Sequence, residues 1–114
     1  MKVASFLENI IFNSNKPSLS LILDTDFSKE IRIVFKKGQV MDDHQAPFAI
    51  IVQVLKGCID FGINNELEKL NDGDIISLKP HEVHSLTAIE DGIVRLTLSK
   101  TDSVKRVKKA ISDK

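Results

Sequence analysis

Residues 48–63 read Phe-Ala-Ile-Ile-Val-Gln-Val-Leu-Lys-Gly-Cys-Ile-Asp-Phe-Gly-Ile, and this stretch decides the fold class. Its first half, Phe48 to Leu55, is almost wholly apolar, which is typical of a strand covered on both faces. Gly57 then interrupts the pattern, and a second β-type run begins at once with Cys58. The stretch therefore predicts two short strands joined by a tight connection or bulge at the glycine.

Comparable apolar or alternating runs lie on both sides of this stretch and are separated by turn residues. They are Ser18–Leu23, Glu30–Phe35, Ile75–Leu78, His84–Ile89 and Ile93–Leu98. Together the runs predict roughly seven or eight strands at about ten-residue spacing, which favours an antiparallel sandwich or barrel. Because long helical patterns do not separate them, a parallel sheet with crossover helices is disfavoured. A closed or double-sheet barrel would also protect the edges of so many short strands.

The chain of 114 residues is long enough for one domain with a buried core. We expect this domain to span residues 1–114, with an N-terminal arm over 1–17, a barrel core over about 18–99 and a short helix over about 102–112. Capping oxygens followed by apolar residues at i, i+3 and i+7 predict the helix. These apolar residues are Val104, Val107 and Ile111. Residues 3–12 fit either a helix or a strand.

Composition and charge weaken several classes of partner. The chain has 16 basic and 16 acidic residues, and therefore no net field that attracts nucleic acid. Residues 100–114 hold six basic residues against two acidic ones, a pattern typical of a solvated helix face. The sequence shows neither a secretory signal nor an apolar run long enough to span a membrane, and its single cysteine, Cys58, fits a reducing compartment. We therefore expect a cytoplasmic protein that binds neither nucleic acid directly nor membranes.

Two motifs built from glycine, proline and histidine frame these runs. In the first, a histidine follows a glycine by six residues and a further glycine comes after the apolar strand; the second is Gly-Asp, an apolar strand, a proline and a histidine. Their framework residues are Gly38, His44, Gly57, Gly73, Asp74, Pro80 and His84. In this pattern the sequence resembles the small single-domain cupins of the RmlC-like superfamily, roughly from Ile31 to Leu98. The resemblance implies an all-β fold, an antiparallel double-sheet jelly-roll barrel.

The resemblance also implies a metal set, from which this sequence departs. Cupins hold a metal with two histidines and a glutamate of the first motif and one histidine of the second. Here His44 and His84 keep two of these positions, whereas Ala46 and Ile50 stand at the others and have no donor atom. Two imidazoles hold a divalent transition metal only weakly unless another side chain joins them. Nearby candidates for that further ligand are Gln39, Asp42, Asp43, Gln53, His81 and Glu82.

With two metal positions replaced, the barrel interior is predicted to be largely apolar with histidine at its rim, which suits a small organic ligand. The predicted pocket residues are His44, Phe48, Ile50, Val52, Phe61 and His84. Binding of such a ligand is the first of three functions that remain open. The second is a metal-dependent oxygenase or isomerase that uses His44, His84 and a non-standard third ligand. The third is an interaction module that forms a homodimer through its apolar N-terminal stretch and its basic C-terminal helix.

Overall fold

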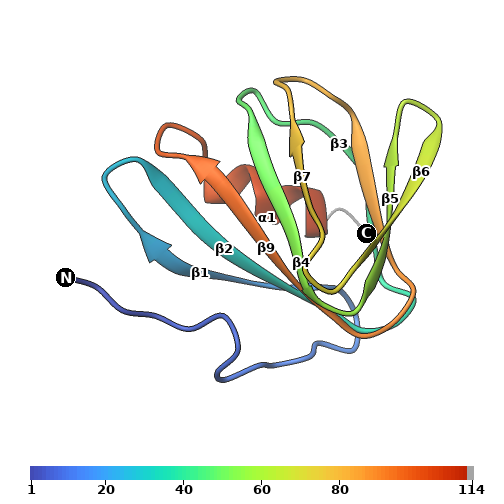
Figure 1. Ribbon diagram of the computed structural model, residues 1–114, viewed down its shortest axis with the longest axis horizontal. Coiled ribbons are helices and arrows are strands. Elements are labelled where there is room, and N and C mark those ends of the chain that lie inside the picture. The colour runs from blue at the N-terminus through green and yellow to red at the C-terminus, as the bar shows by residue number, and fades with distance from the viewer. Residues whose placement is uncertain (113–114) are drawn as a thin grey trace.

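The computed structural model describes residues 1–112, and within them the chain forms nine strands and one helix (Figure 1). The strands are β1 (Ser18–Asp24), β2 (Ser28–Phe35), β3 (Val40–His44), β4 (Ile50–Lys56), β5 (Cys58–Ile63), β6 (Glu66–Asn71), β7 (Ile75–Leu78), β8 (His84–Ala88) and β9 (Gly92–Ser99), and the helix is α1 (Val104–Ser112). The sequence did not reveal β6, because every side chain of this strand except Leu70 is exposed and the strand therefore has no apolar alternation.

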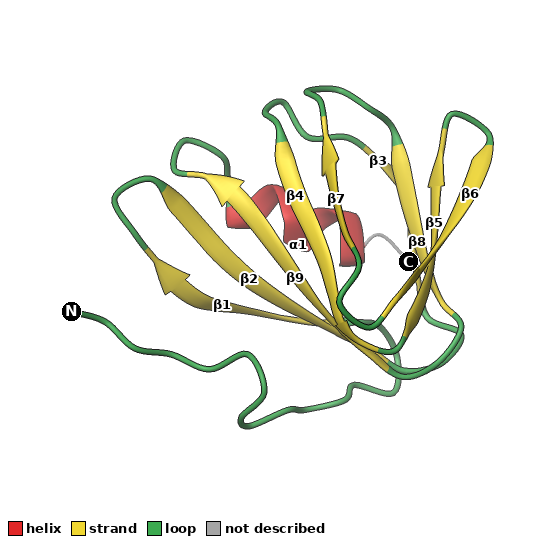
Figure 2. Cartoon of the chain, in the orientation of Figure 1, coloured by secondary structure: helices red, strands yellow, loops and turns green. Residues whose placement is uncertain are grey.

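The strands form two antiparallel sheets that enclose the core between them. The larger sheet has the order β1-β2-β9-β4-β7 and the smaller one the order β3-β8-β5-β6. In Figure 2 the two sheets approach each other at their lower edge and diverge above it. Aliphatic side chains from the facing sides fill the space, with Phe35 and Phe61 as the largest fully buried residues. The predicted all-β class, an antiparallel double-sheet fold with a C-terminal helix, is confirmed.

Strand β4 shows how side-chain alternation builds this core. Ile50, Val52 and Val54 point inward and are buried, while Ile51 points outward and is 40% exposed. The prediction of a strand covered on both faces was therefore wrong: the outer face of the larger sheet is open at this strand. The tight connection at Gly57 is confirmed, because its φ is +105° and a Cβ there would lie 2.5 Å from a backbone oxygen of Asp91.

The N-terminal arm, residues 1–17, is neither helix nor strand, although its apolar spacing fitted both. The guanidinium of Arg32, which points outward from β2, donates hydrogen bonds to the backbone carbonyl oxygens of Phe6 at 3.2 Å, Glu8 at 2.8 Å and Asn9 at 3.3 Å. These carbonyls are thus held by a side chain and not by a helical ladder or a strand partner. The arm lies along the outer face of the larger sheet, where Phe6 and Ile10 are half-buried and the other large apolar side chains of the arm are exposed. These exposed side chains include Val3, Leu7 and Ile11.

Helix α1 begins two residues later than predicted, because Ser103 is its N-cap. The Ser103 hydroxyl accepts a 3.4 Å hydrogen bond from the backbone N–H of Arg106. Val107 and Ile111 are buried in the core, as their spacing predicted, and the helix packs against β3. In the described part of the chain, residues 1–112, there is no helix of the length and apolar character that crossing a membrane requires.

Candidate ligand site

His44 and His84 lie side by side in the smaller sheet. They end β3 and begin β8, which are neighbouring antiparallel strands, and the two residues are direct partners in the register. The interpretation that their strands face each other across the interior was wrong; adjacency in one sheet brings the imidazoles together. The ring centroids are 4.1 Å apart at an interplanar angle of 61°. The imidazole of His84 also stacks against Phe61: the two rings are nearly parallel, and their centroids are 5.5 Å apart.

Both imidazoles are held in the same tautomer by the backbone. Nδ1 of His44 lies 2.7 Å from the carbonyl oxygen of Asp42, and Nδ1 of His84 lies 2.8 Å from that of Glu82. A carbonyl oxygen only accepts, so Nδ1 carries the hydrogen in each neutral ring and Nε2 keeps its lone pair. The site therefore presents two acceptor nitrogens.

The environment keeps these rings neutral at neutral pH. The pKa of His84 is lowered to about 4, chiefly by burial; the neighbouring His44 and Arg106 act in the same direction, and the hydrogen bond to the Glu82 carbonyl opposes them. Burial also lowers the pKa of His44, with Arg106 acting in the same direction. The Asp42 carbonyl opposes this shift. Both imidazoles thus act as hydrogen-bond acceptors rather than as cations.

A small cavity lies beside the two imidazoles and contains about 20 Å³ of free space, roughly what one water molecule needs. Of the predicted pocket residues, His44, Ile50, Val52 and His84 line it. The remaining lining residues are Ile33, Met41, Leu86, Val94, Leu96, Arg106 and Val107. The cavity is apolar apart from the two histidines and the arginine.

Two of the predicted pocket residues do not line this cavity. Phe48 precedes the first residue of β4 and is 37% exposed, because the strand alternation that would turn it inward begins only at Ile50. Phe61 is fully buried but reaches the site only through the ring of His84. Its contact fixes the imidazole and contributes no surface to a ligand.

Arg106 belongs to the cavity, and sequence reasoning missed it. Its Nε and Nη2 donate to the two carboxylate oxygens of Asp102, each at 2.9 Å, one helical turn earlier. Asp102 is itself almost fully buried. The sequence placed all basic residues of the helix on a solvated face; the only signals for Arg106 are an acid four residues before it and the buried Val107 directly after it.

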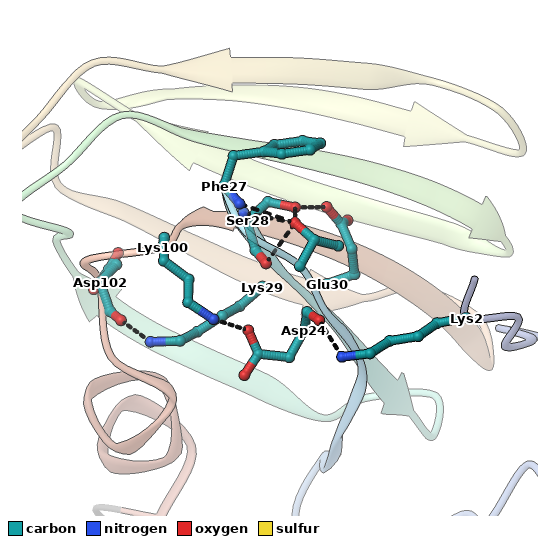
Figure 3. A network of polar contacts seen from close by, with 9 residues as sticks. Lys2, Asp24, Phe27, Ser28, Lys29, Glu30, Lys100 and Asp102 are labelled. Atoms are coloured by element: carbon teal, nitrogen blue, oxygen red, sulfur yellow. Dashed lines mark hydrogen bonds and ion pairs between the residues drawn. The ribbon is translucent and has the colours of Figure 1, made fainter.

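The loop that precedes α1 is held in place from two sides. The carboxylate of Asp102 accepts a 2.7 Å hydrogen bond from the backbone N–H of Ser103. The ammonium group of Lys29, from β2, donates to the backbone carbonyl of Asp102 (Figure 3). The carboxylate that binds the guanidinium of Arg106 is therefore itself held in place by Ser103, and its residue is held by Lys29.

The residues of this site do not fit a resident metal ion. Ala46 and Ile50, at the positions of two expected ligands, are buried and carry no donor atom. Within residues 1–112, no three or more histidine, cysteine, aspartate or glutamate side chains come close enough together to hold a metal. Moreover, the guanidinium of Arg106 lines the same cavity as both imidazoles and would repel a divalent cation.

The proposed further ligands lie elsewhere. Gln53 lines a groove on the outer face of the larger sheet, as its strand position predicted. His81 stands in the turn after Pro80, where its Nδ1 is 3.1 Å from the side-chain oxygen of Gln45. Asp42 and Asp43 are exposed, and Glu82 uses its carboxylate to accept a 2.7 Å hydrogen bond from the backbone N–H of Lys79.

A second hollow, with a volume of about 700 Å³, is the open groove on the outer face of the larger sheet. Its polar centre is the buried Glu30, which accepts hydrogen bonds from Thr97 Oγ1 at 2.6 Å, Ser28 Oγ at 2.8 Å and Arg95 Nε at 3.0 Å. Burial alone would raise the pKa of Glu30, but these three donors outweigh it and lower the pKa. Figure 3 shows Ser28 and Glu30 beside the exposed ring of Phe27.

The two antiparallel sheets, the paired histidines and the two motifs that contain them define a small cupin fold of the RmlC-like type. A model of the AraC-like ligand binding domain matches residues 33–100, more than half of the chain, and the chain belongs to this family.

Solved structures share the fold at low sequence identity. An RmlC-like cupin protein from Desulfovibrio desulfuricans is 21% identical, with a TM-score of 0.78 over 88% of this chain and 97% of that one. A conserved protein with a double-stranded β-helix domain from Klebsiella pneumoniae is 23% identical, with a TM-score of 0.77 over 90% and 94%. A conserved protein of unknown function from Streptococcus pyogenes is 20% identical, with a TM-score of 0.74 over 90% of each chain. No curated protein sequence matches this chain significantly.

Proposed function

We propose that this protein binds a small polar molecule inside its barrel, between His44, His84 and Arg106. The observation that carries the proposal is the convergence of two imidazole acceptors and one guanidinium donor on a single apolar cavity. A few polar groups of defined direction in an otherwise apolar cavity are characteristic of small-molecule sites. Membership in a family of ligand-binding domains supports the same conclusion.

An enzymatic role is less well supported. A metal-dependent oxygenase or isomerase would need a third ligand beside His44 and His84, and Arg106 stands where a cation would be repelled. As a general base, an imidazole with a pKa near 4, such as that of His84, is a poor match for proton transfer at neutral pH. The arrangement therefore favours binding over catalysis.

The size of the cavity links binding to helix α1. The free space fits about one water molecule, and α1 contributes Arg106 and Val107 to its wall. A ligand larger than water therefore enters only if α1 moves away from β3. Binding is expected to change the position of this helix.

Nuclear magnetic resonance of protein with ¹⁵N-labelled histidine side chains tests the proposal. The chain has three histidines, and His81 lies outside the cavity, so it serves as an internal control. When a panel of small polar molecules is titrated in, a ligand of the cavity shifts the imidazole signals of His44 and His84 and leaves that of His81 unchanged. In the variant His84→Gln the affinity falls, whereas in His81→Gln it does not. Shifts confined to His81 contradict the proposal.

Formation of a homodimer is a second candidate, favoured by apolar side chains on the open face of the larger sheet. Phe27, Ile51 and Ile75 line the outer groove and are 79%, 40% and 61% exposed. Apolar surface of this kind on a small protein commonly marks an interaction site. Sedimentation of the variant Ile75→Glu tests this, with Leu67→Glu on β6 as the matched control because Leu67 is 72% exposed on the other sheet. A dimer that persists in Ile75→Glu contradicts this interface.

A further inference from the structure

The guanidinium of Arg106 has hydrogen-bonding capacity that its protein contacts leave unused. Nε and Nη2 donate to Asp102, while Nη1 makes one long contact of 3.4 Å with the backbone oxygen of Gln45. An arginine side chain carries more N–H groups than these three contacts occupy. Since Arg106 lines the cavity, the remaining donors are available to an acceptor placed there.

The orientation of this guanidinium relative to the N-terminal end of α1 is set before any ligand arrives. Asp102 binds it through both carboxylate oxygens, and Asp102 in turn accepts from Ser103 and is bound by Lys29 at its carbonyl. That ion pair occupies Nε and one N–H of Nη2, so the donors left for a ligand carboxylate are the remaining N–H groups of Nη1 and Nη2 in the guanidinium plane. Because Asp102 already orders the side chain, little side-chain entropy is lost when a ligand binds, whereas the movement of α1 adds a cost of its own.

The charges around the cavity favour an anion. Asp102 offsets the charge of Arg106, and the ammonium group of Lys29 binds the backbone carbonyl of the same loop. Asp43 and Glu82 also act through their charges on the pKa of His44 and His84, respectively, but each charge acts more weakly than that of Arg106. The charged side chain that lines the cavity is a cation, and a carboxylate in the cavity would meet the guanidinium of Arg106 directly.

The two imidazoles require something different from the ligand. Each Nε2 presents a lone pair, which repels a carboxylate oxygen and accepts from a hydroxyl. A ligand that satisfies all three groups therefore carries a carboxylate for Arg106 and a hydroxyl for His44 or His84. The remaining wall is apolar, with Ile50, Val52 and Leu86 among its residues, and it offers no partner for further polar groups.

We infer that the cavity is a metal-independent site for a small hydroxycarboxylate, in which Arg106 supplies the fixed positive charge. This inference rests on the proposed function and names the ligand class for that same site. In the cupins that the sequence resembles, a metal ion bound by four side chains stands in the barrel; here two of those side chains are missing and a guanidinium from the C-terminal helix lines the cavity. Because the free space holds about one water molecule, a hydroxycarboxylate enters only when α1 moves outward.

Calorimetric and ¹⁵N-histidine titrations with glycolate in the presence of EDTA test this inference. Acetate lacks the hydroxyl group, and glycolamide lacks the charge. Glycolate is expected to shift the signals of His44 and His84 and to bind more tightly than either comparison compound. The variant Arg106→Gln should weaken glycolate binding about tenfold or more. The matched control Lys105→Gln removes the same charge from an exposed position one residue earlier and should leave the affinity unchanged within about twofold.

The outcomes separate this inference from the proposed function. If glycolamide shifts His44 and His84 as strongly as glycolate and Arg106→Gln has no effect, the ligand class is overturned while binding in the cavity stands. If none of the three probes shifts either histidine, the hydroxycarboxylate class is overturned, and the wider panel decides the proposed function. Should Arg106→Gln fail to fold because Asp102 loses its partner, the double variant Asp102→Asn/Arg106→Gln removes both charges and answers the same question.

Discussion

Two buried carboxylates in this molecule pair with arginines, and they differ in what the pair leaves unsatisfied. Glu30, on the outer face of the larger sheet, binds Arg95, and Asp102, beside the barrel interior, binds Arg106. Glu30 accepts from three side chains, and its arginine is 42% exposed to water. Water therefore satisfies the remaining donors of Arg95, and the network around Glu30 is closed.

The pair formed by Asp102 and Arg106 is different because its arginine is mostly shielded from water. Arg106 is 22% exposed, lines a cavity and has two imidazole acceptors as neighbours on the same wall. Its spare donors and those lone pairs are available to water or to a ligand in the cavity. Two similar ion pairs thus differ in setting: one joins neighbouring strands of the larger sheet, and the other is the pair that we propose to prepare a binding site.

The largest expected effect is a loss of stability when Glu30 is replaced, without a loss of ligand binding. Glu30→Ala leaves three donors without their buried acceptor and should lower the free energy of unfolding by about 3 kcal/mol. The glycolate affinity should stay unchanged, because the groove lies outside the barrel. Urea denaturation and calorimetry measure the two quantities, with the exposed Glu90→Ala as the control. Loss of glycolate binding in Glu30→Ala would show that the two carboxylates do not have separate roles.

A somewhat smaller effect concerns pH and the imidazoles. The pKa of His84 is about 4 in the folded protein, against about 6.5 in an unfolded chain. Between these pH values His84 is protonated in the unfolded state and neutral in the folded state. The free energy of unfolding therefore falls as the pH decreases from about 6.5 to about 4. The loss should be on the order of 2–3 kcal/mol. It should be fully recovered above pH 6.5.

Unfolding free energies measured across this pH range check the expectation. His84→Gln removes one of the two buried imidazoles and should reduce the pH dependence of the unfolding free energy, with the remainder due to His44, whose pKa is also lowered. The exposed His81→Gln should leave the pH dependence intact. Glu30, whose pKa is lowered, becomes protonated and lowers the free energy of unfolding only at more acidic pH. If the unfolding free energy of His84→Gln depends on pH as steeply as that of the unmodified protein, burial does not lower the pKa of His84.

The sequence predicted the strands from local patterns and expected His44 and His84 to converge, although they meet as neighbours within one sheet and not across the interior. Alternation in β4 placed Ile50 and Val52 inward, and the motif glycines and histidines fixed where strands turn. The prediction that both faces of β4 are covered failed, because an apolar residue such as Ile51 gives the same sequence pattern whether or not another layer covers it. The conformation of residues 3–12 could not be decided from the sequence, because their backbone carbonyls are held by Arg32, which is distant in the sequence.

Arg106 could not be predicted, because its surroundings are set by how α1 docks. In sequence it stands among Lys105, Lys108 and Lys109, which are exposed, and only the packing of Val107 against the core turns its neighbour toward the cavity. Of the capping oxygens that residues 101–103 offer, that of Ser103 caps the helix, whereas Asp102 is buried and binds Arg106. Local propensity placed the helix; tertiary contact selected which of its charges faces inward.

The smallest expected effect tests whether the two regions are independent. Lys29 precedes Glu30 in β2, yet its ammonium group binds the carbonyl of Asp102, so it is the physical link between the regions (Figure 3). Lys29→Gln should cost about 0.5 kcal/mol of stability, and glycolate affinity should weaken by about twofold, because a partly exposed charge is screened by solvent. Lys36→Gln, in the exposed turn after β2, is the matched control. If Lys29→Gln weakens glycolate binding as much as Arg106→Gln does, the ammonium group is a principal source of the positive charge and the role assigned to the guanidinium must be divided between them.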